Sequence, residues 1–345
     1  MKQLKTIVAF VAGLFAFTSV QAGEMTVTGS MQATYQSEVD DVTGNPLGMN
    51  TDLTFTGSTD TDFGTATWTM ATDGTFLSES GADHTLKLET SVGTIGIGNT
   101  GDAADAVDDI TPSAFEEANG SGSGTYTVDF GNNNPGSMNL SYANGDVAGT
   151  GISVAYNYYP ELDGTTNNEK SASAAASSAA GDKQSINVGV PLAGLPVIGD
   201  TIVGGAKITL GYEEMDSRVA LAQPEQGGTV AVVVPAGPLS IGFQKKAYQR
   251  AGTAATEAQE IFYKDDIIGL AYAINDDLAI SYNSIQSTKH VVASGTNVEQ
   301  ETKAINLAYT VGGLTIGFQD AKTSNAGYTA ATDDDTRTVS IKTAF

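Results

Sequence analysis

Residues 24–35 read E-M-T-V-T-G-S-M-Q-A-T-Y, and apolar and polar side chains alternate along them. One side of this segment carries Met25, Val27, Met31, Ala33 and Tyr35. The other side carries Thr26, Thr28, Ser30, Gln32 and Thr34. Successive side chains of a β-strand point to opposite faces, so this period of two predicts a strand with one apolar and one polar face.

The same alternation recurs along the whole chain, and we count sixteen such strands. Short turns, such as residues 91–94, alternate with long polar connections. Residues 161–182 are rich in Ser and Ala and are expected to form an exposed loop, with the next strand beginning near Ile186. The fold class expected from this pattern is all-β.

An even number of antiparallel strands can close into a barrel that leaves no unpaired edge in lipid. The aromatic residues favour a sixteen-stranded transmembrane β-barrel, because they share the apolar face and lie mainly near strand ends, as in an interfacial belt. These residues are Tyr35, Tyr142, Tyr156, Tyr212, Tyr272, Tyr282, Tyr309 and Phe345. The alternative is an exported soluble or surface-associated β-rich protein, structural or adhesive, whose apolar faces pack together.

Residues 1–22 have the pattern of a secretory signal peptide, with Lys2 and Lys5, then a short apolar run, then small residues ending at Ala22. Residues 23–345 would then form the barrel. The formal charge of the whole chain is −24, which argues against nucleic acid as a partner. The chain has no cysteine, so burial and hydrogen bonds must hold it together.

Residues 99–136 interrupt the strand pattern after the fifth strand and contain no Lys or Arg. Long loops without regular structure are usually functional. The acidic residues of interest here are Asp102, Asp105, Asp108, Asp109, Glu116 and Glu117. Residues 102–110 are expected to form a short helix that turns Asp102, Asp105 and Asp109 to water and rests Ala103, Ala106, Val107 and Ile110 on a wall.

The opening segment at 24–35, the S-V-G-T-I-G-I-G-N run at 91–99 and the terminal T-V-S-I-K-T-A-F at 338–345 resemble the sixteen-stranded general porins of Gram-negative bacteria. The resemblance implies a homotrimer in the outer membrane, among lipid and lipopolysaccharide, with periplasmic termini. Each barrel would be a water-filled channel for passive diffusion of small hydrophilic solutes and ions. Its third long loop, here 99–136, would fold inward as a constriction. Phe345 would be the terminal aromatic residue that barrel-assembly machinery recognises.

In that family, basic residues on the wall face the acids of the loop across the channel. Strand parity is taken to direct five lysines into the lumen, of which Lys87 and Lys342 are the strongest candidates. The five are Lys87, Lys207, Lys246, Lys303 and Lys342. Basic partners near the loop are scarce, so we expect a preference for cations. The alternative is that the acids form a solvated loop on a generally acidic protein.

Clustered carboxylates at Asp105, Asp108 and Asp109 could also bind Ca²⁺, although the spacing of an EF-hand loop is absent. No other cofactor is expected. Enzymatic function is not expected either, because the only two histidines, His84 and His290, lie in polar stretches and no nucleophile motif is present.

Overall fold

The computed structural model describes residues 25–38, 44–73, 82–116, 118, 138–160, 180–193, 205–217, 223–249, 261–292 and 294–345. The predicted signal peptide lies outside these ranges. In the described ranges, no helix is long and apolar enough to cross a lipid bilayer.

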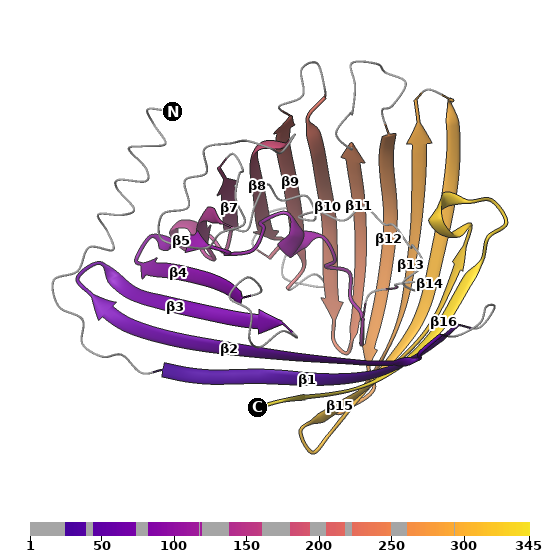
Figure 1. Ribbon diagram of the computed structural model, residues 1–345, viewed down its shortest axis with the longest axis horizontal. Helices are drawn as coiled ribbons and strands as arrows, with labels where there is room; N and C mark the ends of the chain where they lie inside the picture. The colour runs from indigo at the N-terminus through magenta and orange to yellow at the C-terminus, as the bar shows by residue number, and fades with distance from the viewer. Residues whose placement is uncertain are drawn as a thin grey trace.

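Sixteen antiparallel strands form one closed barrel, in which every strand pairs with its neighbour in sequence and β1 pairs with β16 (Figure 1). The predicted strand number and closure are therefore confirmed. The strands are β1 Met25–Glu38, β2 Leu47–Thr61, β3 Gly64–Asp73, β4 Ala82–Thr90, β5 Gly93–Gly98, β6 Asn139–Asn144, β7 Ser153–Tyr159, β8 Ala180–Pro191, β9 Lys207–Ser217, β10 Glu225–Ala236, β11 Leu239–Gln249, β12 Ile261–Ala273, β13 Leu278–Val291, β14 Thr296–Val311, β15 Leu314–Ser324 and β16 Asp334–Ala344.

The two ends of the barrel differ. Tight turns join β2 to β3, β4 to β5, β10 to β11 and β14 to β15 at one end, where β1 begins and β16 ends. The connection of residues 99–138 between β5 and β6 lies at the other end. We call these the short-turn end and the long-loop end.

The outward face of the sheet is apolar and the inward face is polar. Seven of the eight belt aromatics predicted from the sequence are exposed on the outside: Tyr35, Tyr142, Tyr212, Tyr272, Tyr282, Tyr309 and Phe345. Inward positions instead carry buried Ser, Thr, Asn and Gln, among them Ser281, Asn283, Asn306, Gln319 and Thr336. A soluble sandwich would bury the apolar face, so this arrangement suits lipid outside and water inside.

One strand begins earlier than the sequence predicted. β8 starts at Ala180, inside the Ser- and Ala-rich stretch that was expected to be an exposed loop up to residue 182. Gln184, Ile186 and Val188 alternate with Lys183, Ser185 and Asn187, so the period of two extends further back than the apolar residues alone suggested. This difference matters because it brings Lys183 into the wall.

The closing seam between β1 and β16 depends on a small residue at position 29. Gly29 and Phe345 exchange two backbone hydrogen bonds of 2.9 Å each. A Cβ atom at Gly29 would lie 2.7 Å from Cζ of Phe345 and 2.8 Å from the carbonyl oxygen of Asp52. The ring of Phe345 therefore packs over Gly29, where any side chain would collide.

We expect Gly29→Ala to destabilise the barrel by about 1–3 kcal/mol, because overpacking must displace either the Phe345 ring or the β2 backbone. This destabilisation is measured as the shift in the temperature at which half of the protein changes its gel migration on heating. Gly57→Ala on β2 is the matched control, since the atom nearest to its Cβ would be Cε3 of the Trp68 ring, at 4.0 Å. Equal midpoints for the two variants would contradict this account of the seam.

Candidate functional site

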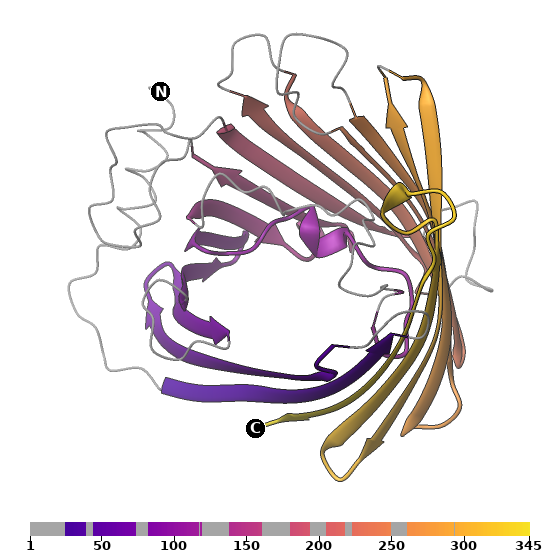
Figure 2. The ribbon, with the colours of Figure 1, turned by 45° about the vertical axis from the view of Figure 1, so that its right-hand side comes forward.

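The described part of the long loop after β5 lies inside the barrel. Residues 99–116 leave the sheet at Gly98 and run along the inner wall, and Figure 2 shows this segment within the ring of strands. The predicted inward fold is thereby confirmed for this part, while residue 117 and residues 119–137 lie outside the described ranges. We call residues 99–116 the inner loop.

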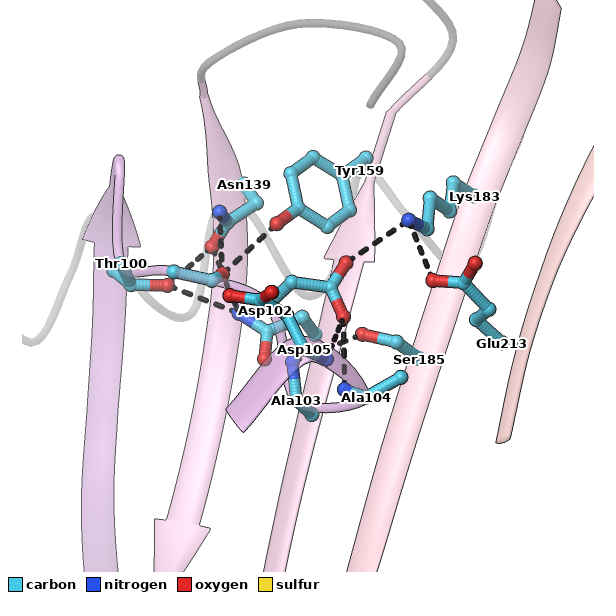
Figure 3. Close-up of polar contacts among 12 residues, drawn as sticks. Thr100, Asp102, Ala103, Ala104, Asp105, Asn139, Tyr159, Lys183, Ser185 and Glu213 are labelled. Atoms are coloured by element: carbon cyan, nitrogen blue, oxygen red, sulfur yellow. Dashed lines mark hydrogen bonds and ion pairs between the residues drawn. The ribbon is translucent and has the colours of Figure 1, made fainter. Parts of the chain in front are cut away.

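An ion-pair cluster joins the start of the inner loop to β8 and β9. Lys183 Nζ lies 3.1 Å from Asp102 Oδ2 and 2.8 Å from Glu213 Oε2 (Figure 3). The Lys183 side chain is 1% exposed. A buried charge is very costly unless it is paired, so the two carboxylates and the ammonium group depend on one another.

The backbone next to Asp102 is also held by side chains of the wall. Asn157 and Tyr159 on β7 each donate a hydrogen bond of 2.9 Å to the Gly101 carbonyl. Asn187 on β8 donates one of 2.6 Å to the Ala103 carbonyl. Asp102 Oδ1 accepts the amide of Ala104 at 2.8 Å, which forms a local turn. The wall thus supplies donors to a loop that has no strand partner.

A second ion-pair cluster lies one turn further along the inner loop. Lys246 Nζ on β11 lies 2.9 Å from Asp108 Oδ1 and 3.1 Å from Asp109 Oδ1. The Lys246 and Asp108 side chains are almost fully buried, whereas Asp109 remains half-exposed. Gln244, two residues earlier on the same inward face, donates to the Val107 carbonyl at 3.0 Å and also to the Asp108 carbonyl.

The inner loop then crosses to the last strands. Asn283 on β13 donates to the Pro112 carbonyl at 3.0 Å, and the Ala114 amide donates to Ser281 at 2.9 Å. Gln32 on β1 donates to Glu116 Oε1 at 3.4 Å. The loop is therefore tied to the wall from β6 around to β1, across most of the barrel.

Glycines in the wall make room for this close approach. A Cβ atom at Gly211 on β9 would lie 2.7 Å from Cγ2 of Val107, and one at Gly269 on β12 would lie 2.8 Å from the Pro112 carbonyl oxygen. Pro112 also lies over Gly242 on β11, and the Phe115 ring lies over Gly317 on β15. A glycine inside a strand often marks such a site, where another backbone approaches closely.

An apolar strip on the inner wall also packs against the loop. Ile267, Ile285, Ala304 and Ala321 on β12 to β15 are buried together with Ala118. Further along, Tyr248 and Tyr263 pack against Ala104 of the inner loop. Apolar residues are unusual on the water side of a barrel, and here the loop covers them. The expectation that the loop rests an apolar side on the wall is correct in this respect.

The predicted helix and its acidic face are wrong in detail. Only one turn of 3-10 helix, η2 (Asp105–Val107), forms within residues 102–110. Asp102 is buried against the wall instead of facing water with Asp105 and Asp109, and Ala106 is exposed instead of buried. The reason is electrostatic, since Lys183 and Lys246 attract Asp102 and Asp108 to the wall. Basic partners are therefore not scarce near the loop.

Of the five wall lysines predicted, Lys246 contacts the loop and Lys303 is placed wrongly. Lys303 lies on the outer face with Ile305, which is 52% exposed, while Thr302, Ala304 and Asn306 are buried on the inner face. It pairs there with Glu301 at 2.7 Å. Lys303 is an even number of residues from the apolar residues of β14, so its side chain points to the outer face of the barrel.

The remaining three predicted lysines face inward but make no ion pair with any residue in the described ranges. Lys87 lies beside Gly96 on β5, and Lys207 lies against Gly189 on β8 near the short-turn end. Lys342 is opposite Gln32, the residue that reaches Glu116. Lys87 is the one basic residue on the inner face of β1 to β5 as far as these strands are described.

Lys183 and Glu213 were missed by sequence reasoning. The signal for Lys183 was its parity with Ser185 and Asn187, hidden by the low-complexity stretch before it. Glu213 shares the inward face of β9 with Thr209 and Gly211, opposite to Leu210 and Tyr212. Both could have been found by extending the period of two into the polar residues of each strand.

A calcium site at Asp105, Asp108 and Asp109, which the sequence left as a possibility, finds no support in the geometry. Within the described ranges, no group of three or more His, Asp or Glu side chains is arranged to hold a metal ion. Asp108 and Asp109 instead share Lys246. His84 and His290 lie near the long-loop ends of β4 and β13, beside Trp68 and Phe262 respectively.

The connection between β15 and β16 also packs on the inner wall near the long-loop end. It contains η5 (Ala326–Tyr328), and the Tyr328 hydroxyl lies 2.6 Å from Ser287 Oγ on β13. The Tyr328 ring lies 5.5 Å from that of Tyr263. Burial raises the pKa of the Tyr328 hydroxyl well above its ordinary value, so this residue stays neutral.

Two buried ammonium groups do not neutralise the acids around the inner loop. The five acids of residues 99–116, together with Glu213, carry six negative charges against the two positive charges of Lys183 and Lys246. The formal balance is −4. Asp105 is exposed, and Asp109 is half-exposed despite its pairing. Negative charge therefore remains on the side of the loop that faces away from the wall.

The closed sixteen-stranded antiparallel barrel of this chain matches solved structures of porins. A porin structure refined at 1.8 Å resolution matches 93% of this chain and 100% of its own, with a TM-score of 0.64 and 14% identity. The anion-selective porin from Comamonas acidovorans matches 94% and 100%, with a TM-score of 0.64 and 13% identity.

The trimer form of OmpT, an outer membrane protein of Vibrio cholerae, also matches 94% of this chain and 100% of its own, with a TM-score of 0.64 and 11% identity. No protein-family model matches the chain, and no curated protein matches it either. At these identities the likeness establishes a porin-like fold.

We expect Lys246→Met to destabilise the protein by about 3–5 kcal/mol, because it leaves the buried Asp108 carboxylate without its ammonium partner. The double variant Lys246→Met/Asp108→Asn should be less destabilised than the single variant, since it removes the buried charge as well. Urea unfolding in detergent measures both.

Lys245→Met is the matched control, because Lys245 is the preceding residue on the outer face, with a side chain that is 73% exposed. An exposed pair of this kind contributes about 1 kcal/mol or less. If Lys245→Met and Lys246→Met lose the same stability, the buried cluster does not hold the loop.

Proposed function

We propose that this protein is an outer-membrane porin of a Gram-negative bacterium, a water-filled channel for passive diffusion of small hydrophilic solutes and ions. The observation that carries the proposal is the combination of an apolar outer face, a polar inner face and an acidic loop fastened across the lumen. Exposed apolar surface of this extent needs lipid, and buried polar residues on the inner face need water or one another.

We further propose that the channel prefers cations. The support is the net negative balance around the inner loop and the exposed carboxylates of Asp105 and Asp109. Rings and clusters of acids attract cations to a pore. One of the similar structures is an anion-selective porin, so the fold is compatible with either preference and the lumen charges must decide.

A homotrimer is part of the proposal. One of the similar structures is a trimer form. Apolar residues are strongly exposed on the outside of β1 and β2, namely Met25, Val27, Leu47 and Met49. No Lys or Arg faces outward on β1 to β10 within the described ranges. We therefore expect copies of the chain, with their export signal removed, to meet at the outer face of β1 and β2.

Purified protein added to a planar lipid bilayer should produce discrete conductance steps, and its gel migration should change on heating. Both follow from a closed barrel around an aqueous lumen. A protein that stays monomeric and soluble without detergent, and gives no conductance, would instead point to the exported structural or adhesive β-protein.

We expect Asp105→Asn/Asp109→Asn to lower the cation-to-anion permeability ratio by roughly two- to fivefold. One unit charge at about 8 Å in water is worth about 0.5 kcal/mol before salt screening. The reversal potential under a salt gradient measures the ratio. Glu301→Gln/Asp320→Asn removes the same charge from the outer face and should leave the reversal potential unchanged. Identical shifts in the two double variants would count against the loop as the selective element.

A further inference from the structure

The far end of the inner loop meets the closing seam of the barrel. Gln32 on β1 donates to Glu116 Oε1 at 3.4 Å, and β1 pairs with β16 at this point (Figure 2). Lys342 on β16 lies directly opposite Gln32 on one side, and Asn50 on β2 lies directly opposite it on the other. Directly opposite side chains point to the same face of a sheet. The loop, β16, β1 and β2 therefore bring polar side chains together in the lumen.

A second carboxylate lies in the adjoining row of the inner wall. Asp52 on β2 is opposite Ser30 on β1, which is in turn opposite the small residue Ala344 on β16. Asp52 Oδ2 accepts a hydrogen bond of 2.9 Å from Ser30, and its Oδ1 accepts one of 3.1 Å from the Asn50 amide group. An ionised carboxylate can accept roughly four hydrogen bonds. The two donors therefore orient Asp52 and leave it able to accept others from the lumen.

The three charged groups around Gln32 are not neutralised by one another. Lys342, Glu116 and Asp52 form no ion pair with any residue in the described ranges. Lys342 and Glu116 are exposed in the lumen, and Asp52 is half-buried. Lys342 and Asp52 are separated by β1 and by one row of the wall, so their backbones are about 12 Å apart by the spacing of strands and residues in a sheet. Positive and negative charge thus face the lumen with room for a small molecule between them.

This arrangement distinguishes between classes of solute. A simple anion is attracted by Lys342 and repelled by Asp52 and Glu116, and a simple cation meets the opposite pair of effects. A small molecule that carries both charges gains from both ends of the site when it is oriented between them. Its carboxylate accepts from the ammonium group of Lys342, and its own ammonium group supplies three donors to the two carboxylates. Hydrogen bonds between charged partners are the stronger class.

We propose that the seam between β16, β1 and β2 is a binding site for small zwitterionic amino acids on their way through the lumen. Lys342 binds the α-carboxylate, and Asp52 and Glu116 bind the α-ammonium group. Gln32 and Asn50 lie between the charges and offer amide groups to either end of the solute. The inference rests on the proposed function, because it concerns a solute inside the channel.

Saturation-transfer NMR of the detergent-solubilised protein tests the proposal, with titrations of alanine, propionate and ethylammonium. Propionate and ethylammonium each keep the methyl group of alanine but carry only one of its two charges. We expect the wild-type protein to bind alanine about tenfold more tightly than either fragment, because one charge-assisted hydrogen bond accounts for a factor of this size.

Lys342→Met/Asp52→Asn removes one positive and one negative charge, so the net charge of the lumen is unchanged. We expect this double variant to bind alanine at least about tenfold more weakly than the wild type. Lys207→Met/Asp60→Asn is the matched control, because it removes the same two charges from the inner wall near the short-turn end, where Asp60 accepts a hydrogen bond of 3.0 Å from Thr65. The control should bind alanine as the wild type does. Lys342→Met alone keeps the test decisive if the double variant fails to fold.

Three outcomes would overturn the proposal: no detectable alanine binding to the wild type, equal affinity for alanine and one of its fragments, or equal alanine affinity in the wild type and the Lys342 variants. Planar-bilayer conductance of the same preparations separates this inference from the proposed function. A protein that conducts but does not bind alanine loses only the inference, whereas a protein that never conducts loses the proposed function.

Discussion

Closure of the sheet is the constraint on which the rest of the molecule depends. A strand with an apolar outer face cannot leave its amide and carbonyl groups unpaired in lipid, so every strand needs two neighbours and β1 must find β16. Closure then creates an interior, and the inward face of each strand becomes a wall that can hold a segment with no strand partner. The inner loop makes most of its hydrogen bonds with that wall, and the others within itself.

The ion pairs divide the acids of the loop into two groups. Asp102 and Asp108 are buried against Lys183 and Lys246, so their charges mainly fix the position of the backbone. Asp105 and Asp109 remain accessible from the lumen. A count of acidic residues therefore overstates the charge that a permeating ion would meet. The positions of the lysines determine which acids are structural and which are available.

The period of two was sufficient to predict the strands, their number and the outer aromatic residues, because alternation is dictated by the lipid and water on either side. The contacts of the inner loop were harder to predict from the sequence. Lys183 was hidden by a Ser- and Ala-rich stretch, and Lys303 was assigned to the wrong face although Ile305 shares its parity. The glycines at 211, 242, 269 and 317 were visible in the sequence. No local pattern, however, distinguishes a glycine that makes room for a loop from a glycine that only weakens a strand. Pairs such as Asp102 with Lys183 join distant residues, which no local pattern encodes.

The contacts of the inner loop also set an order of assembly. Its residues bond to side chains that follow far later in the chain, as in the contact of Gln319 with the Glu116 carbonyl, 203 residues apart. The loop cannot reach its final position until β8 to β15 have formed, because side chains of these strands hold it. Contacts of such large sequence separation form slowly. Seating of the loop is therefore a late event in biogenesis, and a barrel that closes without it would be complete in its sheet yet open in its lumen.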